Sequence, residues 1–177
     1  MDLRKKKTED AIRRAFYDLR KKKTTEYIRV REICERAQIN KSTFYRHFSD
    51  VFELEEKLED SIVKEIVDDI CTGPSIIQNA EEFFFYLDEA FNGKKNCERK
   101  EILFSADPCR LLTKTEDMLR QRMMEEENYS FEDYILIAYA LGGAFSVFRV
   151  GSLFIKKPDV PAIYGLLAQY ADRIFLK

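Results

Sequence analysis

The chain has 177 residues, 45% of them hydrophobic, with only six Gly and four Pro, so it suits one or two helical domains with a substantial core. Its charge is unevenly placed: residues 1–50 hold 15 Lys and Arg against 8 Asp and Glu, whereas residues 51–177 are acidic, which is typical of a nucleic-acid-facing domain joined to a domain with another role. No apolar run approaches the about 20 residues of a membrane helix, and MDLRKKKTED lacks the apolar core of a signal peptide, so we expect a cytoplasmic protein.

The first helix is predicted at about Thr8 to Lys22, with Thr8 as its N-cap and Glu9 and Asp10 in its first turn. A stripe at helical spacing predicts its buried face, formed by Ile12, Ala15, Phe16 and Leu19. The basic residues Arg4 to Lys7 precede it. They are either an arm that follows DNA phosphates or enters an adjacent groove, or a solvated and frayed terminus.

The stretch 28–48, IRVREICERAQINKSTFYRHF, predicts two short helices joined by a tight turn. The first, about Val30 to Ala37, has the spacing of one buried helix face. The second runs from about Lys41 to His47, with Asn40 as its N-cap, and buries Phe44 and Phe48. Because only Gln38-Ile39-Asn40 separates them, the pair is interpreted as a helix-turn-helix.

The outer face of the second helix is rich in hydrogen-bond donors. Helical geometry turns Ser42, Thr43 and Arg46 outward and places Tyr45 and His47 on the flanks. No acidic residue occurs from Ala37 to Ser49. Such a face suits phosphates and base edges in a DNA major groove.

The run Asn40 to Phe48 resembles the DNA-binding domain of the TetR family of transcriptional repressors, in which this helix typically ends in Tyr-x-His-Phe. The likeness covers roughly Thr8 to Leu58. It implies an all-α fold with an N-terminal three-helix helix-turn-helix domain (residues 1–50), a connecting helix (about 50–71), and a larger helical ligand-binding and dimerisation domain (51–177). It also implies a homodimeric repressor that binds a palindromic operator and is released by a small-molecule effector.

The resemblance also assigns roles to single residues. It places Lys41, Ser42 and Thr43 where the helix enters the groove. It places Tyr45 and His47 at phosphates and Arg46 either in the groove or at a phosphate. Arg31 is a further phosphate contact.

Three positions depart from the family's pattern. Arg29 stands where Ser or Thr often caps the first helix of the motif, and Gln38 where Gly usually makes the turn. Val51 stands where Lys often contacts phosphate. We expect Gln38 to adopt an unfavourable backbone conformation at a modest cost.

The next helix is predicted to start at Asp50, with Glu53 completing a pair like a capping box, and to reach about Cys71. Its apolar residues recur every four positions, at Leu54, Leu58, Ile62, Ile66 and Ile70. Thr72-Gly73-Pro74 ends it. Further helices are expected at about 75–91, 98–105 and 108–127, and no strand pattern competes with them.

The last two predicted helices, Phe131–Ile155 and Val160–Leu176, are the candidates for the contact between two subunits. The first is apolar on nearly every side and therefore needs burial on more than one side. Two such helices from each of two subunits would form a four-helix dimer interface, as the resemblance also implies. A two-fold dimer reads two half-sites, so we expect an inverted-repeat operator.

An effector pocket is predicted between the helices of the larger domain. The candidate lining residues are aromatic or apolar, with one cation: Phe83, Phe84, Tyr86, Phe104, Met118, Tyr139, Phe148 and Arg149. Aromatic residues at helical spacing are more often plain core than pocket lining. Arg149 needs an acidic partner in its apolar helix, either a carboxylate of the protein or an acidic ligand.

No enzyme activity, metal site or cofactor is expected. The one histidine, His47, lies in the helix-turn-helix, which excludes a His-based triad, and no Gly-rich phosphate loop is present. The cysteines form no C-x-x-C pair and are expected to be free thiols; they are Cys34, Cys71, Cys97 and Cys109. Two function classes remain: a DNA-binding regulator, favoured by the basic N-terminal part, and a helical protein-interaction module with weak or secondary DNA binding.

Overall fold

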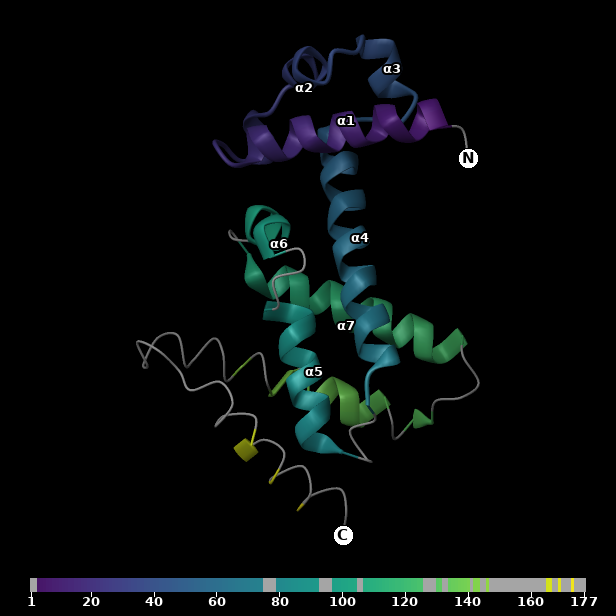
Figure 1. Ribbon diagram of the computed structural model, residues 1–177, viewed down its shortest axis with the longest axis vertical. Helices are drawn as coiled ribbons and strands as arrows, with labels where there is room; N and C mark the ends of the chain where they lie inside the picture. Colours follow the sequence, from purple (N-terminus) through teal and green to yellow (C-terminus); the bar gives the residue numbers. More distant parts are fainter. Residues whose placement is uncertain are drawn as a thin grey trace. The chain divides into compact units, whose positions relative to one another are not determined.

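The computed structural model describes residues 3–74, 79–92, 97–104 and 107–125, and shorter pieces at 130–131, 134–140, 142–143, 146, 165–166, 169 and 173. Every regular element in these residues is a helix, which confirms the all-α prediction (Figure 1). None of these helices is long and apolar enough to cross a membrane. The chain divides into two compact units: a first unit of residues 1–62 and 96–107, and a second unit of residues 63–95 and 108–177.

The first helix, α1, spans Leu3–Arg20 and so begins five residues before the predicted start. The prediction that Thr8 is its N-cap is wrong, because the Thr8 hydroxyl lies inside the helix and donates to the Arg4 carbonyl at 3.0 Å. Lysine and arginine are good helix formers, and nothing in Arg4 to Lys7 breaks a helix. These basic residues are therefore exposed helical residues of α1. The predicted apolar stripe of α1 is buried, as expected.

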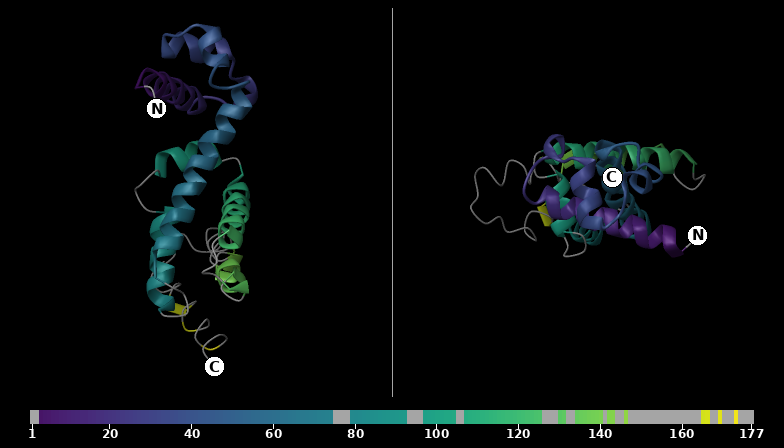
Figure 2. Two further views of the ribbon diagram at one scale, coloured as in Figure 1. Left: turned by 90° about the vertical axis from the view of Figure 1, so that its right-hand side faces the viewer. Right: turned by 90° about the horizontal axis from the view of Figure 1, so that it is seen from above.

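The helix-turn-helix consists of α2 (Val30–Ala37) and α3 (Lys41–Tyr45), preceded by the short 3-10 helix η1 (Thr25–Tyr27). In Figure 1, α2 and α3 lie together on one side of α1, and Figure 2 shows the same placement from the side. The α2 bounds agree with the prediction, whereas α3 ends two residues before the predicted His47. The predicted inward-facing Phe44 and Phe48 are both buried.

The long helix α4 spans Val51–Thr72, close to its prediction, and its four-residue apolar repeat is buried throughout. Its start is capped from both directions. The Asp50 carboxylate accepts from the Glu53 N–H at 2.8 Å, and the Glu53 carboxylate accepts from the Ser49 N–H at 2.5 Å. Hydrogen bonds from Lys57 first, and then from Ser49, lower the pKa of Glu53 to about 2. The acid therefore stays ionised at the positive N-terminal end of α4.

A buried ion pair connects α1 to α4 inside the first unit. Arg20, the last residue of α1, donates through Nε to Glu55 of α4 at 2.9 Å, and the two side chains are only 9% and 10% exposed. The Thr25 hydroxyl of η1 donates to the same Glu55 oxygen at 2.6 Å. Glu55 thus holds together three elements of the first unit.

The helix α6 (Cys97–Phe104) also belongs to the first unit, although it is distant in sequence. It packs against α1, and Lys21 pairs with Glu98 at 2.6 Å. The hydrogen bond and charge of Glu98 raise the pKa of Lys21. The first unit is therefore built from two separate stretches of the chain.

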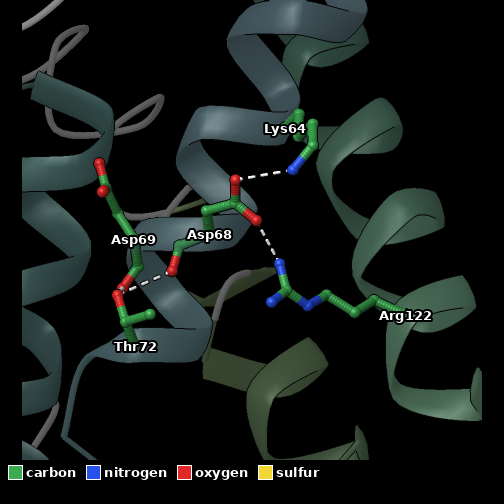
Figure 3. A network of polar contacts seen from close by, with 5 residues as sticks. All are labelled: Lys64, Asp68, Asp69, Thr72 and Arg122. Atoms are coloured by element: carbon green, nitrogen blue, oxygen red, sulfur yellow. Dashed lines mark hydrogen bonds and ion pairs between the residues drawn. The ribbon is translucent and has the colours of Figure 1, made fainter. Parts of the chain in front are cut away.

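The second unit contains the C-terminal part of α4 together with α5 (Ala80–Asn92) and α7 (Pro108–Glu125). Figure 3 shows Arg122 of α7 reaching Asp68 of α4, which also accepts from Lys64 at 2.8 Å. The hydrogen bond from Lys64 lowers the pKa of Asp68 most, Arg122 adds to the effect, and burial opposes it. Residues 75–78, where the predicted helix at 75–91 begins, lie outside the described residues. So do residues 126–127, where the predicted helix at 108–127 ends.

Replacing Arg20 with Met should destabilise the protein by about 3 kcal/mol or more, because it leaves the buried Glu55 carboxylate without its cation. Adding Glu55→Met to this variant should restore more than half of the loss. Urea unfolding followed by circular dichroism measures both free energies. Arg31→Met is the matched control, because the Arg31–Glu35 pair is exposed to water and should contribute little to stability. A double variant no more stable than Arg20→Met would contradict this explanation.

Replacing Asp68 with Asn should lower the free energy of unfolding at pH 7 by less than about 1 kcal/mol, because the ion pairs of Asp68 are partly in water. The folded pKa of Asp68 lies below its ordinary value, so its contribution is complete above that ordinary value, near pH 4, and is lost as pH falls through the folded pKa. Urea unfolding at pH 7 and pH 3 should therefore show the difference shrinking at pH 3. Asp117→Asn, which breaks only the pair with Arg120 inside α7, is the control.

Candidate nucleic-acid interface

Asn40 organises the start of α3. Its backbone is extended, and its side-chain oxygen accepts hydrogen bonds from the Thr43 N–H and the Ser42 hydroxyl, both at 2.8 Å. The predicted N-cap is therefore confirmed. Because the cap fixes the first turn, the side chains of Lys41, Ser42 and Thr43 leave α3 from a defined backbone.

The turn between α2 and α3 places Gln38 in the left-handed region, at φ 55° and ψ 45°. It is the one non-glycine residue with positive φ among the described residues. The N–H groups of Gln38 and Ile39 both donate to the Cys34 carbonyl, which closes the end of α2. The predicted unfavourable backbone conformation of Gln38 is therefore confirmed. A side chain in this conformation generally costs about 1 kcal/mol relative to glycine.

The outer face of α3 is open to solvent. Lys41, Ser42, Tyr45 and Arg46 are exposed, with Tyr45 at 55%, whereas Thr43 and His47 are half-buried. The Tyr45 ring lies edge-on to the buried Phe44 ring, with centroids 5.6 Å apart. Arg46 donates to the Thr43 hydroxyl at 3.0 Å. The structure thus brings six of the seven predicted DNA contacts together in and directly after α3.

Arg31 lies apart from these six residues, on α2. Its Nε donates to Glu35 one turn later at 2.7 Å, and this hydrogen bond and charge raise the pKa of Arg31. To contact a phosphate, the Arg31 guanidinium would have to bind it together with Glu35 or in place of Glu35. Sequence reasoning missed this pair, although the i, i+4 spacing of Arg31 and Glu35 signals it.

The departures at Arg29 and Val51 are accommodated locally. Arg29 provides no side-chain cap for α2, but the Glu32 carboxylate accepts from the Arg29 N–H at 2.9 Å. The hydrogen bond from Lys23 lowers the pKa of Glu32 most, followed by the one from Arg29. Val51 is buried in the first unit and contributes packing there.

The predicted effector residues fall into both units and beyond the described residues. Phe83 and Phe84 are buried in the second unit with ring centroids 5.7 Å apart, whereas Tyr86 and Tyr139 are exposed. Met118 is half-buried in the second unit, and Phe104 is buried in the first. Phe148 and Arg149 lie outside the described residues. The pocket stays a prediction.

The described part of the predicted interface helix Phe131–Ile155 exposes three large hydrophobic residues at i, i+4 and i+8. They are Phe131 at 71%, Ile135 at 46% and Tyr139 at 58%. Residues at this spacing lie on one helix face. Most of Val160–Leu176 lies outside the described residues.

The described cysteines are free thiols, as expected: Cys34 is buried, Cys71 half-buried and Cys109 exposed. Burial raises the pKa of the Cys34 thiol. The Cys97 side chain lies outside the described residues. Within the described part of the chain, no group of three or more His, Cys, Asp and Glu residues could hold a metal ion.

No protein-family model matches the sequence, and no curated protein matches it. Among solved structures, the chain is similar to the dihydroxyacetone kinase operon activator DhaS, with 18% identity, a TM-score of 0.52 and 93% of each chain covered. It also matches the TetR family repressor AlkX from Dietzia sp. strain DQ12-45-1b, with 16% identity, a TM-score of 0.42, and 93% of this chain and 95% of that chain covered. The likeness to DhaS shows a shared fold.

Replacing Gln38 with Gly should raise the free energy of unfolding by about 1 kcal/mol, because glycine adopts positive φ without a clash at Cβ. Urea unfolding of the purified variant measures the gain. Gln38→Ala retains Cβ and should show no gain. A glycine variant no more stable than the alanine variant would mean that the left-handed turn is not strained.

Proposed function

We propose that the protein is a DNA-binding transcriptional regulator whose α3 enters the DNA major groove. The exposed, carboxylate-free face of α3 carries the proposal, because it presents an ammonium, a guanidinium and hydroxyl donors from one short helix. Lys41, Ser42 and Thr43 would contact base edges, and Tyr45 and His47 phosphates. Arg46 and Arg31 would add phosphate contacts, Arg31 by exchanging its carboxylate partner. No catalytic role is assigned to any residue.

Two likenesses support this proposal and suggest the TetR family. Asn40 to Phe48 resembles the family's recognition helix, and the chain shares its fold with DhaS, which is named as an operon activator. Because DhaS is an activator, the fold is compatible with activation as well as with repression. We favour repression because the resemblance at α3 is to repressors.

We further propose that the protein acts as a homodimer on a palindromic operator. The exposed apolar row formed by Phe131, Ile135 and Tyr139 supports an interface in Phe131–Ile155, with Val160–Leu176 completing it. Exposing an apolar row of this kind to water is unfavourable, and such rows are typical sites of protein association. A small-molecule effector bound among the predicted pocket residues would release the operator.

The alternative is a helical protein-interaction module with weak or secondary DNA binding. The same exposed apolar row is compatible with a protein partner. DNA binding across a salt series separates the two functions. Operator DNA bound well above scrambled DNA, with affinity falling steeply as salt rises, favours the regulator. Equal and weak binding to both favours the interaction module.

Lys41→Ala and Tyr45→Ala should each weaken operator binding about tenfold, because each removes one direct contact from the groove-facing helix. Binding is measured by fluorescence anisotropy with DNA from immediately upstream of the gene. Both side chains are exposed, so the unfolding transition should be unchanged. Arg120→Ala on α7 removes a charge from the second unit and is the control. Unchanged operator affinity in both α3 variants would refute the assigned interface.

A further inference from the structure

A cavity of about 390 Å³, open to solvent on one side, lies within the first unit and is lined by side chains of α1, α4 and α6. None of its lining residues belongs to the α3 face or to the predicted effector residues. Its volume falls in the range of cavities that hold small ligands. The side chains that line the cavity indicate which chemical class of ligand it would bind.

The wall carries a concentration of positive charge. Arg13 and Arg14 of α1 and Arg99 of α6 line the cavity, and Asp10 is the one carboxylate among the described lining residues. Arg13 pairs with Glu9 at 2.5 Å, and Arg14 donates through Nε to the Asp10 backbone carbonyl at 3.3 Å. Arg99 forms no ion pair with any residue that the structure describes. Guanidinium groups stay charged, so this wall attracts anions.

Arg13 adds an independent indication. Its Nε is buried and has no hydrogen-bond acceptor among the residues that the structure describes, even though its Nη2 binds Glu9. Buried N–H groups are almost always paired with protein, water or ligand. An acceptor inside the cavity would satisfy this donor.

The rest of the lining favours an organic anion over a bare ion. Leu58 and Ile62 of α4 supply apolar surface, while Tyr17 and Ser61 supply hydroxyl groups. A phosphate of the DNA backbone would gain nothing from the apolar residues, whereas the carbon skeleton of a small molecule would pack on them. Arginine binds both carboxylate and phosphate groups through two parallel hydrogen bonds.

We propose that this cavity binds a small organic anion, with its phosphate or carboxylate group held by the three arginines and its carbon skeleton against Leu58 and Ile62. Because α1 and α6 both contribute arginines, the bound anion joins two separate stretches of the first unit. The site is distinct from the effector pocket proposed above and does not depend on DNA binding.

Isothermal titration calorimetry of the full chain at constant ionic strength tests the site with phenyl phosphate and benzoate as probes and benzyl alcohol as the uncharged comparison. We expect saturable binding of one anion per chain and none of the alcohol. Tighter binding of phenyl phosphate would assign a phosphate ligand, and tighter binding of benzoate a carboxylate. Failure of both anions to bind saturably would overturn the proposal.

Arg99→Gln and Arg14→Gln should each weaken anion binding about tenfold, because each removes a charge-assisted hydrogen bond. Both side chains are exposed, so the folded structure should be retained. Arg36→Gln removes an exposed arginine of the same unit outside the cavity and should leave binding unchanged. An equal loss in all three variants would reveal general charge attraction and refute the site. The site would also be refuted if Arg99→Gln, in the absence of anion, weakened operator binding as strongly as Lys41→Ala does.

Discussion

The buried ion pair between Arg20 and Glu55 is the interaction on which the first unit depends. It joins the end of α1 to α4, and the Thr25 hydroxyl extends it to η1. The helix-turn-helix occupies the chain between η1 and α4, so its position relative to α1 is limited at both ends. A buried ion pair adds little net stability compared with apolar packing, because both charges lose water. We interpret it as the contact that selects one register of α4 against α1.

The helix-turn-helix tolerates unusual residues because each is compensated nearby. The Glu32 carboxylate accepts the Arg29 N–H at the start of α2, and the Cys34 carbonyl accepts the N–H groups that close the turn at Gln38. The backbone of α3 then depends mainly on Asn40 and on the buried Phe44. Its outer side chains contribute little to folding, and they are free to be selected for a ligand.

Local patterns predicted much of this fold. Periodicity and caps gave the bounds of α2 and α4 and the complete outer face of α3, because these depend on neighbouring residues. The start of α1 was missed, since Thr8 is acceptable both as a cap and inside a helix. The pair of Arg20 and Glu55 was not predicted, although Arg20 follows Phe16 by four residues and Glu55 follows the buried Val51 by four. The cavity depends on α6, whose contact with α1 crosses more than 70 residues and has no local signal.

The place of α6 also has a consequence for protein synthesis. The first unit contains residues 1–62 and 96–107, so the ribosome must add the intervening part of the second unit before the first can be completed. At about 5–20 residues per second, the surface of α1 that contacts α6 remains uncovered for several seconds on every nascent chain. Residues 1–62 are therefore made well before the first unit can finish folding, which requires the chain up to residue 107.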